Sequence, residues 1–182
     1  MKKIIYSPGE PSGIGPDLII KLSSSNLWED LKIPIVSIGD PKLFIDRAAL
    51  LKKKIKIIEL ESLNQVSKNC KGLIQIIKVT KCSNTRPGKL YKSNAQYVLD
   101  NLTYSIKQTM QNEGTALVTG PLSKENIISI DKLFTGHTEY IKKITKSKDV
   151  LMMLASDQLR VALATTHIPV SYTHLRAHET DR

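Results

Sequence analysis

The chain has 182 residues, of which 41% are hydrophobic and 24% are charged, a balance typical of a globular protein with a buried core. No apolar run approaches the roughly 20 residues of a membrane-spanning helix, so we expect no membrane partner. The net charge of +10 does not indicate nucleic-acid binding, because the basic residues are scattered and aromatic residues make up only 5% of the chain.

Strands and helices are predicted to alternate along the sequence. Lys3–Tyr6 is interpreted as the first strand of a cytoplasmic protein, because its apolar stretch is too short for a secretion signal and a Pro/Gly turn follows. This alternation predicts an α/β fold with a largely parallel sheet. Further strands are expected at 33–38, 55–58, 73–77, 115–119, 150–154 and 160–165, and helices at 16–22, 41–51, 93–110, 124–130 and 138–146.

The helix expected from residue 93 has the clearest signals. Ser93 and Gln96 match the S-x-x-Q pattern of a capping box at a helix N-terminus. Apolar residues then recur at four-residue spacing from Val98 to Met110, and Gly114 follows as a stop signal.

Four polar loops, each after a predicted strand, carry the candidate chemistry, because ligands of α/β proteins bind at the carboxyl ends of strands. The first loop, 9–17, is glycine-rich, but Leu18 stands where a dinucleotide fingerprint needs glycine, and no G-K-[ST] of a Walker loop follows. Two interpretations are equally open: a purely structural turn, or an anion site at the N-terminus of the next helix.

The other three loops span residues 119–124, 134–139 and 164–169. The last two contain His137 and His167. A lone histidine is usually structural, but both of these lie beside Gly or Pro and next to threonine in strand-end loops. Such positions favour binding over packing.

Five motifs between Ile4 and Pro169 resemble, in order, the 4-hydroxythreonine-4-phosphate dehydrogenases of vitamin B6 synthesis. The resemblance implies the two-domain α/β fold of isocitrate and isopropylmalate dehydrogenases, with the active site in the cleft. Residues 1–169 would contribute parts of both domains, so the fold is expected to be incomplete here. The motifs are G-E-P-S-G-I-G-P-D, T-G-P-x-x-K, F-T-G-H-T-E, M-M-L-A and L-R-V-A-L-A-T-T-H-I-P.

The resemblance also implies an activity. Members of the family are oxidoreductases that use NAD to oxidise 4-phosphohydroxy-L-threonine to a β-keto acid, which decarboxylates to 3-amino-2-oxopropyl phosphate on the route to pyridoxal phosphate. By motif matching, His137 and Thr138 would bind the substrate, and His167 would bind a divalent metal such as zinc, magnesium or cobalt. Lys124 is a further candidate for a catalytic cation. Members are homodimers whose metal site draws on both subunits.

Two departures from the family bear on this chain. Family members are longer, and their other metal-ligating histidines and most NAD contacts lie in a C-terminal half, so we expect the 182-residue chain by itself to be inactive. Residues 170–182 do not follow the family and look like the translation of an adaptor used in sequencing libraries. We interpret them as a non-native tail; the rival interpretation is a genuine tail with His174 and His178 as a metal-binding pair.

Two further functions remain open at this point. The first is a related dehydrogenase acting on another four-carbon phosphorylated hydroxy acid. The second is a non-catalytic module that binds a phosphate or a nucleotide. The four loops do not separate these alternatives from the first interpretation.

Overall fold

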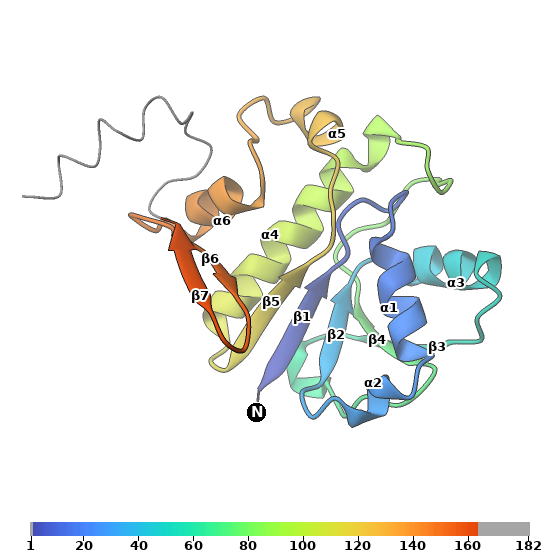
Figure 1. Cartoon of the computed structure of the whole chain (residues 1–182). Coiled ribbons are helices and arrows are strands. Elements are labelled where there is room, and N and C mark those ends of the chain that lie inside the picture. Colours follow the sequence, from blue (N-terminus) through green and yellow to red (C-terminus); the bar gives the residue numbers. More distant parts are fainter. Residues whose placement is uncertain (1, 164–182) are drawn as a thin grey trace, which may run out of the picture. The chain divides into compact units, whose positions relative to one another are not determined.

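The computed structural model describes residues 2–163 of the chain, which divide into two compact units at residues 145 and 146 (Figure 1). The first unit is a five-stranded parallel sheet with helices on both faces, and the second is a two-stranded hairpin. The predicted α/β fold with a parallel sheet is therefore confirmed.

The sheet of the first unit has the strand order β3-β4-β2-β1-β5, and every pairing in it is parallel. The three central strands are largely buried, as expected for apolar strands that are covered by helices on both faces. All five strands lie where the sequence predicted them, within a few residues. Their bounds are β1 (Lys3–Ser7), β2 (Ile35–Ile38), β3 (Lys56–Leu60), β4 (Leu73–Ile77) and β5 (Thr115–Thr119).

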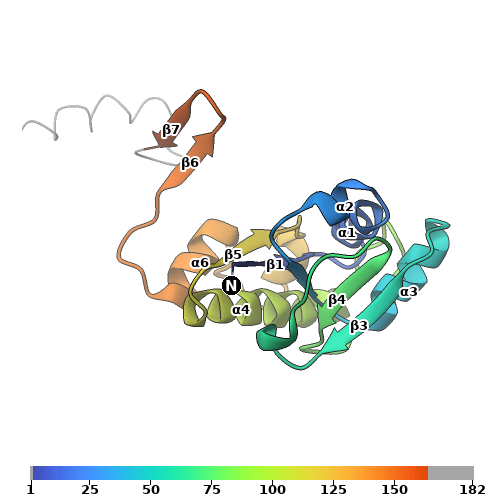
Figure 2. The same cartoon turned by 90° about the horizontal axis from the view of Figure 1, so that it is seen from below.

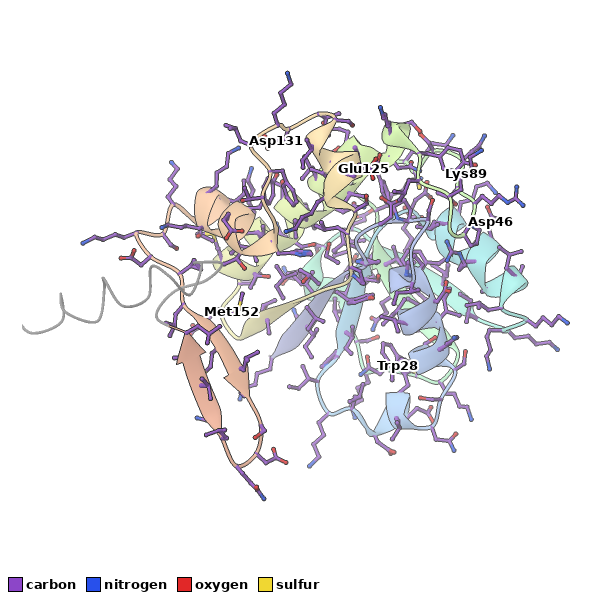
Figure 3. The ribbon with its side chains drawn as sticks, turned by 45° about the horizontal axis from the view of Figure 1, so that its top comes forward. Trp28, Asp46, Lys89, Glu125, Asp131 and Met152 are labelled. Carbon is purple, nitrogen blue, oxygen red and sulfur yellow. The ribbon has the colours of Figure 1, made fainter. Side chains whose placement is uncertain are left out.

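Helices cover the two faces of this sheet (Figure 2). The helices α1 (Gly15–Ser23) and α2 (Leu27–Asp30) lie on one face, and α3 (Pro41–Leu50) packs beside α1. Trp28 of α2, labelled in Figure 3, is only 1% exposed. The long helix α4 (Ala95–Gln111) lies on the opposite face, where α5 (Lys124–Ile128) and α6 (His137–Thr145) pack against it.

The start of α4 differs from the prediction. The helix begins at Ala95, after a 3-10 turn at Lys92–Asn94, and no side chain caps it, so the capping box predicted at residue 93 is wrong. The amide of Gln96 instead donates to Asp100 Oδ1 at 2.7 Å. The capping position is taken by Asn94, whose Oδ1 accepts from Ser83 N–H at 2.9 Å. The short α2 and the 3-10 turn at 63–65 were not predicted, because a single turn has no periodicity to detect.

The second unit is a hairpin of β6 (Met152–Ala155) and β7 (Arg160–Leu163). Its strands were predicted, but they pair antiparallel and not in the parallel sheet, with Met152 opposite Leu163. The turn is closed by Ser156 N–H, which donates to Leu159 O at 2.8 Å. Residues 164 and 165, predicted to extend the second strand, lie outside the described residues. Within 2–163, no helix has both the length and the apolar character needed to cross a membrane.

One buried arginine connects α3 to the loop after β1. Arg47 is 3% exposed, and its guanidinium donates to Pro11 O at 2.7 Å, Gly13 O at 2.9 Å and Asp17 Oδ1 at 2.6 Å. A buried guanidinium is tolerated when its donors are matched by acceptors, as they are here. Arg47 therefore fixes the loop that leads from β1 into α1.

Replacing Arg47 with methionine should destabilise the protein by about 3 kcal/mol, because removing one partner of a buried pair leaves the other without compensation. The side chain of Asp17 is 22% exposed, so the expected loss of stability lies at the low end of the range for buried pairs. Lys42→Met is the matched control, since the pair between Lys42 and Asp46 is exposed and should contribute nothing measurable. Urea unfolding followed by circular dichroism measures both, and equal effects would contradict this role for Arg47.

Candidate functional site

The first two candidate loops meet at one edge of the parallel sheet, because the carboxyl ends of its strands all point the same way (Figure 1). The chain leaves β1 toward α1 on one face, whereas it leaves β5 toward α5, which packs against α4 on the other face. Neighbouring strands whose connections diverge in this way form the crevice in which α/β proteins bind ligands. The first and second predicted loops lie at this point, where β1 and β5 end.

The loops after β1 and β5 are in backbone-to-backbone contact. Glu10 N–H donates to Pro121 O at 2.9 Å. A methyl group at Gly9 would overlap Pro121 O, and one at Gly120 would overlap Pro8 O. Gly9 also has a φ of +79°, which favours glycine on its own account. The close approach of two main chains therefore explains Gly9 of the first motif and Gly120 of the second.

The loop after β1 is also fixed from within. Tyr6 donates its hydroxyl to Gly15 O at 2.9 Å, and burial raises the pKa of Tyr6 to about 12, so this donor stays protonated at neutral pH. Asp17, in the first turn of α1, is paired with Arg47. These contacts support the interpretation of this loop as a structural turn. The anion site at the start of α1 stays a prediction.

The third predicted loop follows helix α5 and not a strand, so its predicted place at a strand end is wrong; it leads directly into α6, which begins at His137. His137 and Thr138 therefore lie in the first turn of that helix, as expected from the sequence. Tyr140 N–H is the first in α6 to reach a main-chain acceptor, at 3.1 Å from Gly136 O; the N–H groups of the three preceding residues have no partner among residues 2–163. Free N–H groups and the positive end of the helix dipole favour a negatively charged ligand.

Lys124 lies beside this helix N-terminus. A methyl group at Gly136 would lie 3.6 Å from Lys124 Nζ and 3.4 Å from Glu139 Oε2. These are ordinary van der Waals distances, and they place the ammonium group of Lys124 beside Gly136 at the start of α6. The structure thus brings together three of the residues singled out in the sequence, namely Lys124, His137 and Thr138.

Burial, and secondly the positive charge of Lys124, lower the pKa of His137. The imidazole is therefore neutral at pH 7, with one nitrogen as hydrogen-bond donor and the other as acceptor. An anion bound between Lys124 and His137 would reverse this effect, because it favours the protonated imidazole. The cluster is suited to a phosphate or a carboxylate.

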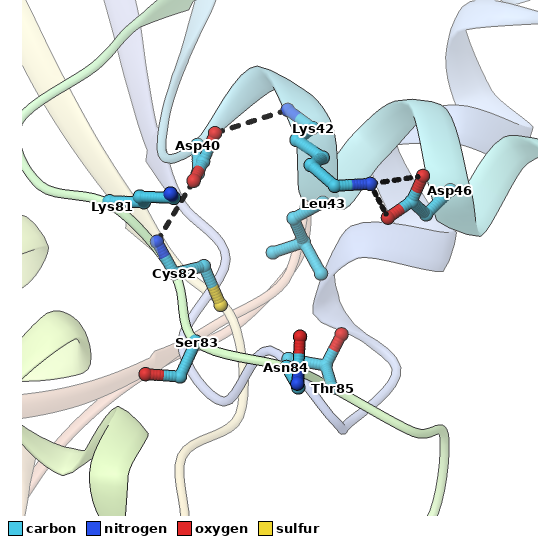
Figure 4. Close-up of a pocket in the computed structure, with 9 residues that line it drawn as sticks. All are labelled: Asp40, Lys42, Leu43, Asp46, Lys81, Cys82, Ser83, Asn84 and Thr85. Carbon is cyan, nitrogen blue, oxygen red and sulfur yellow. Dashed lines mark hydrogen bonds and ion pairs between the residues drawn. The ribbon is translucent and has the colours of Figure 1, made fainter.

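A polar pocket of about 340 Å³, separate from the cluster around His137, lies at the carboxyl ends of β2 and β4 (Figure 4). On its wall the buried carboxylate of Asp40 accepts from Lys42 N–H at 3.1 Å and from Cys82 N–H at 2.9 Å. Burial, followed by the charges of Asp40 and Glu10, raises the pKa of Cys82 to about 12. The thiol therefore stays protonated and is not a nucleophile at neutral pH.

Several buried polar residues around the loops were missed in the sequence. Arg47 gave no local signal, since its partners are 30 to 36 positions away in the chain. Asp40 stands before Pro41 at a helix start, which is a local capping signal, but its contact with Cys82 is 42 positions away. Glu10 stands inside a recognised motif, but only the structure shows its contact with Asn126, at 3.2 Å. A lone asparagine in a short helix carries no pattern that sequence reasoning detects.

His167 lies outside the described residues. Between residues 2 and 163, no three His, Cys, Asp or Glu side chains converge on a point where they could share a metal ion. The described residues therefore do not form a metal site by themselves.

Comparison with protein families gives a match over residues 30–178 to the family described as pyridoxal phosphate biosynthetic protein PdxA. Among curated proteins, the chain is 36% identical over 170 residues to a 4-hydroxythreonine-4-phosphate dehydrogenase of Citrobacter koseri, which covers 93% of this chain and 50% of that protein. It is 39% identical over 180 residues to the enzyme of that name in Pseudoalteromonas translucida, covering 99% and 53%. The chain thus spans about half the length of the curated relatives it matches.

A solved structure of an enzyme with the same name also matches this chain. The crystal structure of 4-hydroxythreonine-4-phosphate dehydrogenase from Klebsiella pneumoniae superposes with a TM-score of 0.83 at 26% identity, covering 93% of this chain and 51% of that one. The corresponding structure from Burkholderia phymatum gives 0.83 at 23% identity, over 94% and 52%, which bears on the fold alone.

Replacing Gly120 with alanine should push the loops after β1 and β5 apart, because the new methyl group overlaps Pro8 O. The expected cost is about 1–3 kcal/mol, as for other overpacked sites. The amide NMR signals of residues 8–14 should shift at the same time. Gly114→Ala is the control, since its φ of +74° strains the backbone while its methyl group meets only Lys2 at ordinary contact distance. Unshifted signals in the Gly120 variant would contradict the contact.

Proposed function

The chain belongs to the PdxA family of pyridoxal phosphate biosynthetic proteins, and on that basis we propose that it is the N-terminal part of an NAD-dependent 4-hydroxythreonine-4-phosphate dehydrogenase. The substrate would be 4-phosphohydroxy-L-threonine. Its secondary hydroxyl would be oxidised, and the resulting β-keto acid would lose carbon dioxide to give 3-amino-2-oxopropyl phosphate.

A cluster of groups that favour an anion supports this proposal from the chain's own residues. Lys124, His137 and the N-terminus of α6 form a single cluster whose ammonium, imidazole and main-chain N–H groups all favour an anion. The substrate carries a phosphate and a carboxylate, so such a cluster matches its chemistry. Curated relatives that match nearly the whole chain bear the name of this enzyme.

In this proposal His137 and Thr138 bind the substrate. The neutral imidazole and the threonine hydroxyl donate hydrogen bonds to phosphate or carboxylate oxygens, and Lys124 adds positive charge beside them. A divalent metal bound near the substrate hydroxyl would lower the pKa of that hydroxyl. In this proposal the described residues bind and orient the substrate.

The remaining assignments follow from the same resemblance. His167 is proposed as a ligand for zinc, magnesium or cobalt, and its site would be completed by residues beyond this chain and by a second subunit of a cytoplasmic homodimer. Residues 1–169 are proposed as enzyme sequence and 170–182 as a non-native tail, on the sequence pattern of 170–182 alone, since the family match itself runs to residue 178. The 182-residue chain alone is expected to be inactive.

His137→Ala or Thr138→Val should weaken binding of 4-phosphohydroxy-L-threonine to the 182-residue chain by roughly 10- to 150-fold, since a hydrogen bond to a charged group contributes about 1.5–3 kcal/mol. In the unsubstituted chain, the ligand should also raise the pKa of His137, because an anion stabilises the imidazolium. Calorimetry and NMR titration measure the two effects. Lys143→Met, which removes a cation from the last turn of the same helix, is the control and should leave the affinity nearly unchanged. Full affinity in the His137 variant, with a large drop in melting temperature, would show instead that His137 has only a structural role.

His167→Ala should lower metal content and turnover together in a chimera that joins residues 1–169 to the remaining half of the Citrobacter koseri relative. The melting temperature of the metal-free chimera should change little, because a loop residue contributes little to a core. NAD reduction and bound metal are measured side by side. An alanine variant with unchanged metal content and rate would rule out His167 as a ligand, and a chimera without any turnover would contradict the proposed activity.

A further inference from the structure

Glu10 is a buried carboxylate whose partners are all neutral. It is 4% exposed, Oε1 accepts from Ser12 N–H at 3.2 Å, and Oε2 accepts from the side-chain amide of Asn126 at 3.2 Å. Within residues 2–163, no lysine or arginine lies within ion-pair distance of it. Burying a carboxylate is costly unless hydrogen bonds compensate for lost water, so these two contacts have a function in the fold.

Asn126 connects three segments of the chain. Its side-chain Nδ2 donates both to Glu10 Oε2 and to Tyr91 O, the latter at 3.0 Å. Its main-chain N–H donates to Ser123 Oγ at 3.2 Å, which caps α5. The loop after β1, the segment before α4 and the start of α5 therefore meet at one amide group. An amide that donates two hydrogen bonds in a buried setting has a fixed orientation.

The placement of α5 depends on such contacts. The helix has only five residues, so it gains little stability from its own hydrogen bonds, and its position is decided by what it packs against. Its buried residues are Asn126 and Ile127. Its first residue is Lys124, whose ammonium group lies beside Gly136 and the N-terminus of α6. Fixing Asn126 therefore fixes the backbone from which Lys124 extends.

We propose that Glu10 is a positioning residue: through its hydrogen bond to Asn126 it fixes α5 so that Lys124 faces the N-terminus of α6. This inference rests on the proposed function, in which that cluster binds an anionic substrate. Within residues 2–163 Glu10 forms no hydrogen bond with Lys124 or His137, and it acts through Asn126. The carboxylate is the suitable acceptor, because both of its oxygens are used while Asn126 supplies the donor.

The test uses the 182-residue chain and follows the pKa of His137 by NMR, with inorganic phosphate as the probe for anion binding. Burial and Lys124 lower this pKa, and among residues 2–163 the carboxylate of Glu139 also lies beside the helix N-terminus. Lys124→Met defines the value reached when the ammonium group is absent. Glu10→Ala should raise the pKa of His137 toward that value and weaken phosphate binding about 10-fold. Glu10→Gln, which keeps one acceptor and folds more readily, should give a smaller change in the same direction.

Two comparisons separate positioning from plain stability. In the Lys124→Met background, Glu10→Ala should have no further effect on the pKa of His137, since the group it positions is gone. Asn126→Ala, which removes the donor to Glu10 Oε2, should change both quantities in the same direction as Glu10→Ala. Glu125→Ala removes an exposed carboxylate from the same helix (Figure 3) and should change neither quantity.

A lower melting temperature in the Glu10 variants, with the pKa of His137 and phosphate binding unchanged, would overturn the proposal and leave Glu10 as a structural residue. Failure of the proposed function would look different. In that case the unsubstituted chain would not bind phosphate, yet the pKa of His137 would still respond to Glu10 and Lys124 in the order expected. The two inferences therefore fail by separate observations.

Discussion

The contact between the loops after β1 and β5 is the constraint on which the rest of the site depends. It is made by main-chain atoms, since Gly9 approaches Pro121 and Gly120 approaches Pro8 with no room for a side chain. A contact of this kind cannot adjust by changing rotamers. The two loops therefore form one rigid unit, and every segment that leaves it starts from a fixed position.

The ionisable residues around this unit form two groups with different roles. Arg47 and Glu10 are buried and use their hydrogen bonds on the loop after β1 and its neighbours. Lys124 is exposed, and His137 is kept neutral by its surroundings. The buried charges define the backbone, while the accessible groups remain available to a ligand. This separation is the usual way in which a site is preorganised, because binding then requires little rearrangement.

Much of the fold was predictable because periodicity is a local property. Alternating apolar and β-branched runs located all five strands of the sheet, and the motif residues around His137 fell at a helix N-terminus as expected. The errors have physical causes. Ser93 and Gln96 matched the sequence pattern of a capping box. In the structure Asn94 takes the capping position, and its side chain accepts a hydrogen bond from Ser83 in the preceding loop. Glu10 and Asn126 are 116 positions apart, and one sequence offers no signal for such a pair. The reason for glycine at positions 9 and 120 could also be seen only in the structure, because each of these residues is restricted by main-chain atoms of the other loop.

The strand order has a consequence for how the protein forms during synthesis. β1 precedes the other four strands of its sheet in the chain, yet it lies inside the sheet, and its pairing with β5 can form only after Thr115–Thr119 has been synthesised. Until then one side of β1 offers unpaired backbone groups to any other extended chain. Pairing across such a distance in sequence is slow, since a long loop must close first. The nascent chain therefore passes through a period in which β1, β2, β4 and β3 can assemble while the edge that later accepts β5 is open, and this is the stage at which a chaperone would protect it most.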